Sequence, residues 1–105
     1  MFSCGGENIY PKEVEDLLFR HPAVANAVVA PVPHAVKGYV PAALVVLKRG
    51  ASAEAEALKT WCLDNGPKYA HPRFIRIIDE KDMPLNGAGK IDRAIAKTRL
   101  AALVA

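Results

Sequence analysis

The segment at residues 84–93, with the sequence PLNGAGKIDR, places a lysine at the end of a loop with two glycines, just before a short helical segment. Gly87 and Gly89 have no Cβ, so the backbone can turn tightly there and approach a ligand closely. Lys90 carries a compact ammonium group on a flexible stem, which suits contact with an anion. An ordinary surface turn with a solvated lysine would show the same residues, so this loop alone leaves both interpretations open.

A second pair of glycines lies near the N-terminus, where residues 3–15 read SCGGENIYPKEVE. This stretch resembles the start of the small C-terminal domain of adenylate-forming enzymes, a family of acyl-CoA synthetases, luciferases and peptide-synthetase adenylation domains. The family has a GGENI-x-P-x-E-(V/I)-E stretch near the start of that domain and a P-x-x-x-x-GK-(I/V)-x-R stretch near its end. Both stretches occur here in that order, and the resemblance covers essentially all 105 residues.

The resemblance implies a catalytic role for Lys90. In the family, the lysine at this place enters the active site in the first half-reaction, when a carboxylate attacks the α-phosphate of ATP and gives acyl-AMP and pyrophosphate. A positioned cation stabilises the negative charge that gathers around the phosphorus. Gly87 and Gly89 would shape the loop that presents this lysine, although an ordinary turn explains them as well.

The resemblance also implies a second site at Gly5, Gly6 and Glu7. In the family this loop faces the active site in the second half-reaction, when a thiol attacks the acyl-adenylate. A glycine backbone would let the slim pantetheine arm pass close by. Glu13 and Glu15 belong to the same motif, but their place near the start of a helix already explains them electrostatically.

Three residues before and within a predicted strand form a further candidate site. Arg73, Phe74 and Arg76 could hold the phosphates and the adenine of CoA by charge and by stacking, or could be strand residues with solvated charges. Arg93 follows Lys90 by three residues and could share its helical side. For Arg93, both phosphate contact and a solvated surface position remain open.

Cysteine and histidine usage indicates no metal site and no disulfide. Cys4 and Cys62 are the two cysteines, and we expect reduced thiols in a cytoplasmic protein, with Cys62 packed as a small apolar group. His21, His34 and His71 lack the spacing of zinc ligands. No apolar run approaches the roughly 20 residues of a membrane span, and no signal peptide pattern opens the chain.

The formal net charge of +3 is mild, and the basic residues are scattered along the chain. A phosphate-bearing small molecule explains these charges with fewer assumptions than a nucleic acid, for which the sequence offers no base-reading motif. We therefore expect small-molecule partners and no nucleic acid.

Periodicity and breaker residues predict one domain over residues 1–105, of the α+β class. We expect a small, mostly antiparallel three-stranded sheet covered by helices, which is also the build of the family's C-terminal domain. Asp92 should cap the last helix, and Ser52 should cap the middle one. The predicted elements are an extended segment at 1–9, helices at 11–20, from 52, and at 92–103, and strands at 23–33, 39–48 and 74–78.

The resemblance implies the mobile C-terminal lid of an acid–CoA ligase that acts on a fatty or aromatic carboxylic acid. ATP, CoA and Mg²⁺ would serve the full-length enzyme, and the partner would be its N-terminal AMP-binding domain. The hinge residue would then precede Met1, and the chain alone would be an inactive excised domain. Two alternatives remain: the lid of an adenylation domain that loads a carrier protein, and a non-catalytic binding domain.

Overall fold

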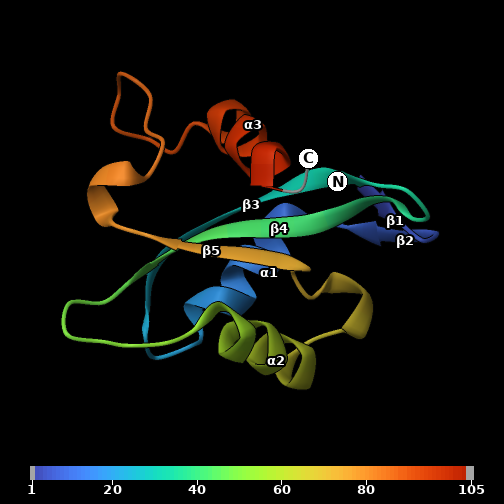
Figure 1. Ribbon diagram of the computed structural model, residues 1–105, viewed down its shortest axis with the longest axis horizontal. Coiled ribbons are helices and arrows are strands. Elements are labelled where there is room, and N and C mark those ends of the chain that lie inside the picture. Colours follow the sequence, from blue (N-terminus) through green and yellow to red (C-terminus); the bar gives the residue numbers. More distant parts are fainter. Residues whose placement is uncertain (1, 104–105) are drawn as a thin grey trace.

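Strands and helices are interspersed along residues 2–103, which are the residues that the computed structural model describes (Figure 1). Their bounds are β1 (Phe2–Cys4), β2 (Glu7–Ile9), α1 (Pro11–Phe19), β3 (Val24–His34), β4 (Gly38–Leu47), α2 (Ala55–Asn65), β5 (Phe74–Ile78) and α3 (Arg93–Leu103). Two short 3-10 helices, η1 (Lys68–Ala70) and η2 (Glu80–Asp82), lie on either side of β5.

The sheet is built around the long β3–β4 hairpin, which pairs Ala30 with Ala42 and His34 with Gly38. Over the described residues the strand order is β2–β1–β4–β3, with β5 running parallel to β4 and the other pairs antiparallel. The α+β class with a mostly antiparallel sheet is therefore confirmed. The described sheet has five strands, two more than predicted, because the N-terminal extended segment folds back on itself into β1 and β2.

The two longest strands, β3 and β4, are buried on both faces. Figure 1 shows α3 on one side of the sheet and α1 and α2 on the other, and both α1 and α3 pack against β3. Val28, Val29, Leu44 and Val45 are each no more than 2% exposed. Strands covered on both faces need no polar alternation, which explains why β3 and β4 read as nearly continuous apolar runs.

The first two helices differ in how well their starts were predicted. Pro11 opens α1, where its missing N–H is harmless, as expected. The middle helix begins three residues after Ser52, and its N-cap is Glu54, so the prediction that Ser52 caps it is wrong. The Leu58 N–H donates to the Glu54 carbonyl at 3.1 Å, which fixes the first helical turn beyond Ser52.

The last helix begins as predicted and buries one narrow face. The Asp92 carboxylate accepts the Ala94 and Ile95 N–H groups at 3.0 and 3.1 Å, which confirms the predicted cap. Ala96 and Leu100 are fully buried, whereas Ile95 and Leu103 are each 41% exposed. Ile95 is one residue, or about 100°, away from Ala96 around the helix, so it turns away from the sheet. None of the helices described here could span a bilayer.

Cys62 packs in the core as expected, and burial raises the pKa of its thiol to about 11. At pH 8 the thiolate fraction should therefore be about 100-fold lower than for an ordinary cysteine. We expect iodoacetamide to label Cys62 at least that much more slowly in the native protein than after unfolding, measured by peptide mass spectrometry. Labelling of the native protein at the rate of the unfolded chain would contradict this packing.

Candidate functional site

The loop that carries Lys90 is closed by backbone hydrogen bonds. At its base the Asp92 N–H donates to the Pro84 carbonyl at 2.8 Å. Further out, the Asn86 N–H donates to the Lys90 carbonyl at 2.7 Å. The segment is thus a short hairpin-like loop that holds its own shape, and Lys90 closes its tip.

Asn86 organises the tip of this loop. Its side-chain oxygen accepts the Ala88 N–H at 2.9 Å and the Lys90 N–H at 3.1 Å. Gly89 has a φ of +78°, a left-handed conformation that favours glycine. Gly87 has no positive φ, and a Cβ there would meet nothing within 4 Å, so its role stays a prediction. The sequence analysis missed Asn86, although asparagine at the start of a glycine turn is a known turn signal.

The Lys90 side chain is exposed. Within residues 2–103 its ammonium group has no hydrogen bond and no ion pair. A lysine that neutralises no neighbour on its own domain can contact an anion brought from outside the chain.

Gly5 and Gly6 form the tight turn between β1 and β2. Their φ values are +58° and +91°, and the flanking residues Cys4 and Glu7 pair across the turn. Positive φ at both central residues is typical of the turns that join two antiparallel strands. The Gly6 position is open, because a Cβ there would meet nothing within 4 Å.

The tip of the β3–β4 hairpin packs against this turn. The Gly5 N–H donates to the Lys37 carbonyl at 3.3 Å. A Cβ on Gly5 would lie 3.7 Å from the Cδ of Lys37, so the aliphatic stem of that lysine covers the turn on one side. Lys37 was not among the predicted site residues, and only the pairing of the two hairpins brings it here.

Several basic groups gather around His71, just before β5. Burial lowers the pKa of His71 most, a hydrogen bond to the Lys68 carbonyl opposes this, and the charges of Arg73, Lys59 and Lys37 lower it further. These residues come from η1, the start of β5, α2 and the β3–β4 hairpin. We call Lys37, Lys59, His71 and Arg73 the basic cluster.

The basic cluster reaches the glycine turn through Arg73. Its guanidinium group donates to the His71 carbonyl and lies 3.8 Å from the Cys4 sulfur, and Cys4 adjoins the turn. Arg73, Phe74 and Arg76 line one hollow together with Lys59 of α2, and Arg76 also lines a second hollow with Arg99 of α3. The structure therefore brings the three predicted residues to one hollow, and their joint role in holding CoA stays a prediction.

The two motif loops lie far apart on the domain. Figure 1 shows the β1–β2 hairpin toward one end of the longest axis and the loop between η2 and α3 toward the other. That axis measures 37 Å. Lys90 and the glycine turn therefore do not form one site on this chain.

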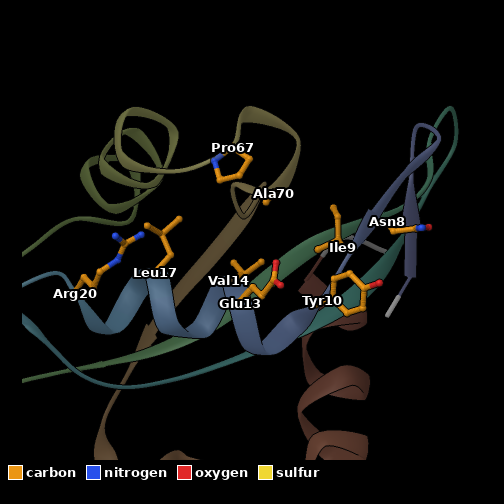
Figure 2. A pocket seen from close by; sticks show the side chains of 9 residues that line it. All are labelled: Asn8, Ile9, Tyr10, Glu13, Val14, Leu17, Arg20, Pro67 and Ala70. Atoms are coloured by element: carbon orange, nitrogen blue, oxygen red, sulfur yellow. The ribbon is translucent and has the colours of Figure 1, made fainter.

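A small cavity lies between β2, α1 and the segment at η1 (Figure 2). Its volume is about 200 Å³, which is below the range of about 300–1,000 Å³ that drug-sized ligands occupy. We assign it no ligand. Its lining residues are Asn8, Ile9, Tyr10, Glu13, Val14, Leu17, Arg20, Pro67 and Ala70.

Arg93 lies at the surface, where 54% of its side chain is exposed, and its guanidinium forms an ion pair with Glu15. Its guanidinium donates to the Glu15 carboxylate twice, at 2.5 and 2.6 Å. The Glu15 side chain is only 9% exposed, and it also accepts the Val29 N–H at 2.8 Å. The hydrogen bonds that Arg93 donates to Glu15 raise the pKa of Arg93 above its ordinary value. Helical spacing could have indicated that Glu15 is buried, because it precedes the buried Leu18 by three residues and so lies on the same side of the helix.

Curated relatives of this chain are ligases. A 2-succinylbenzoate–CoA ligase of Geobacillus kaustophilus is 46% identical over 89 residues, which is 85% of this chain and 18% of that protein. A long-chain-fatty-acid–CoA ligase of Bacillus subtilis is 40% identical over 90 residues, 86% of this chain and 16% of that protein. The chain thus spans less than a fifth of the length of these relatives.

Solved structures agree with the fold. Apo MatB from Rhodopseudomonas palustris superposes with a TM-score of 0.88 at 28% identity, over 99% of this chain and 20% of that one. An o-succinylbenzoate CoA synthetase from Bacillus subtilis, bound to a product analogue, gives a TM-score of 0.78 at 38% identity, over 89% of this chain and 18% of that one.

The sequence model of the AMP-binding enzyme C-terminal domain matches residues 13–90. Since that match covers most of the chain, the protein belongs to the family of AMP-binding enzyme C-terminal domains.

Proposed function

We propose that this chain is the mobile C-terminal lid of an AMP-forming acid–CoA ligase. Its family membership and its similarity to named CoA ligases support this function. The short span that it covers in these relatives supports a role as one part of a larger enzyme, whose remaining part supplies the pockets for ATP and acid.

The placement of the two motif loops is the observation that carries the proposal. Lys90 and the Gly5–Gly6 turn lie toward opposite ends of one domain, so a single orientation cannot present both to the same reacting centre (Figure 1). A rotation of the lid between the half-reactions resolves this. One orientation brings Lys90 to the α-phosphate of ATP, and the other brings the Gly5–Glu7 turn to the attacking thiol.

Lys90 would act in the first half-reaction by stabilising charge. As the carboxylate attacks and pyrophosphate leaves, the ammonium group would contact the crowded phosphoryl oxygens. Mg²⁺ would accompany the ATP, and among residues 2–103 no group of three or more His, Cys, Asp and Glu side chains that could hold a metal ion gathers.

The basic cluster supports free CoA as the thiol in the second half-reaction. Lys37 and Arg73 place positive charge near the glycine turn, along which the pantetheine arm would pass, and Lys59 adds a further cation to the cluster. Free CoA carries a pyrophosphate and a further phosphate on its ribose, whereas a carrier-bound arm has one phosphodiester. A cluster of several cations therefore suits CoA better than a carrier protein.

The acid would be fatty or aromatic. The relatives that support this class are the ligases for long-chain fatty acids and for 2-succinylbenzoate. The acid pocket would belong to the N-terminal part of the enzyme, so this chain would affect rates rather than the choice of acid.

A domain exchange tests the proposal. The chain would replace the C-terminal segment of the Geobacillus kaustophilus ligase, and 2-succinylbenzoyl-CoA formation would be followed by chromatography. We expect activity at least about tenfold above that of the N-terminal portion alone, and none from the isolated chain. The matched control is that N-terminal portion with its own C-terminal segment. A folded chimera that binds ATP but forms neither the acyl-adenylate nor the thioester would contradict the proposal.

A further inference from the structure

The outer edge of β3 is closed by side chains instead of by another strand. At Val29 the N–H points away from β4 and donates to the Glu15 carboxylate at 2.8 Å, while the Val29 carbonyl accepts from Arg93 at 3.4 Å. Glu15 belongs to α1 and Arg93 opens α3, so the ion pair joins two helices around the sheet edge. It also covers backbone groups that an edge strand would otherwise leave open to pairing.

This ion pair stands at the base of the Lys90 loop. Arg93 follows Asp92, which closes the loop by its hydrogen bond to the Pro84 carbonyl. On the other strand of the loop, Met83 is buried in the core at 5% exposure. Backbone hydrogen bonds within the loop fix its internal shape. The orientation of the loop on the domain therefore depends on its two anchors, Met83 and Arg93.

We propose that the Glu15–Arg93 pair is a positioning clamp that sets the direction of the Lys90 loop for the adenylation step. The inference rests on the proposed function and assigns a role to residues that contact neither ATP nor the acid. Two parallel hydrogen bonds from a planar guanidinium fix orientation as well as distance. A misplacement of about 1 Å at a reacting group can cost about 100-fold in rate, so a loosened clamp should be visible in the chemistry.

Glu15→Gln is the informative variant, because the amide oxygen can still accept the Val29 N–H but the side chain can no longer neutralise the guanidinium. Arg93→Lys is the second variant. It keeps the positive charge beside Glu15 but loses the bidentate hydrogen bonding of the guanidinium group. Asp16→Asn is the matched control. It removes one carboxylate from the same helix, where Asp16 forms only an exposed 3.9 Å pair with Lys12.

The variants are made in the chimera described above, and each half-reaction is measured separately. Pyrophosphate release reports acyl-adenylate formation, and CoA thioester formation from supplied acyl-AMP reports the second step. We expect Glu15→Gln to slow adenylation by about 10- to 100-fold while thioester formation stays within about threefold. Arg93→Lys should lie between this variant and the parent, and Asp16→Asn should match the parent in both steps.

A merely structural role predicts a different result, because a destabilised domain would slow both half-reactions together. Equal losses in both steps for Glu15→Gln and Arg93→Lys, or no loss in either step, would overturn the clamp. Failure of the proposed function is distinguishable, since replacing Lys90 itself would then leave adenylation unchanged. A defect for the Lys90 variant with normal adenylation in both clamp variants would overturn the clamp alone.

Discussion

Replacing Lys90 with alanine should reduce acyl-adenylate formation by several hundred-fold or more and leave thioester formation from supplied acyl-AMP intact. Removing a preorganised cation or donor from a developing charge typically costs about 10²- to 10³-fold in rate. The Lys90 ammonium group has no partner on the described part of its own domain, so its loss should not disturb folding. Pyrophosphate release and acyl-CoA formation, measured in the chimera, separate the two steps.

The matched control for this variant is Lys97→Ala, which removes the same charge from the exposed surface of α3. It should leave both half-reactions unchanged. Lys90→Arg should rescue poorly, because the broad guanidinium fork needs more room than one ammonium group. The role of Lys90 is refuted if the alanine variant performs both steps at the parent rate.

Gly6→Ala should have the second largest effect, on the thioester step. The φ of +91° at Gly6 strains any residue with a Cβ by about 1–2 kcal/mol. The new methyl group would point into space that is open in this chain, where the pantetheine arm is proposed to pass. We expect thioester formation from supplied acyl-AMP to slow by about tenfold or more, with adenylation within about threefold.

Gly50→Ala separates backbone strain from the site. Gly50 has a φ of +79°, its added Cβ would also meet nothing within 4 Å, and it lies in the connection between β4 and α2. Both alanine variants should therefore lower the free energy of unfolding by similar amounts in thermal melts. If Gly50→Ala slows the thioester step as much as Gly6→Ala, strain explains the effect and the glycine turn has no special part in it.

Much of the fold follows from short stretches of sequence. Pro11 opens α1 and Asp92 caps α3, as expected, because each effect acts within one helical turn. The strands predicted at 23–33, 39–48 and 74–78 all form, since runs of branched apolar residues favour strands. Ser52 shows the limit of such local evidence, because Glu54 caps that helix instead.

Only part of the candidate site could be predicted from short stretches of sequence. The glycines and Lys90 stand in contiguous motifs, so their resemblance to a family could be recognised without knowing the chain's path. Their roles stay predictions. Asn86 carried a turn signal that was overlooked, whereas nothing local marked Lys37 or Lys59 as neighbours of His71.

The sequence by itself determined the order of the elements, the buried character of the main strands and the family to which the chain belongs. Tertiary structure alone decided that β5 runs parallel to β4, that the two motif loops lie toward opposite ends of the domain, and that Glu15 meets Arg93 across 78 residues of chain. Propensities, caps and turn residues act over a few neighbours, so they can be read in short windows. Contacts between distant segments depend on how the whole chain buries its apolar surface, which no short window contains.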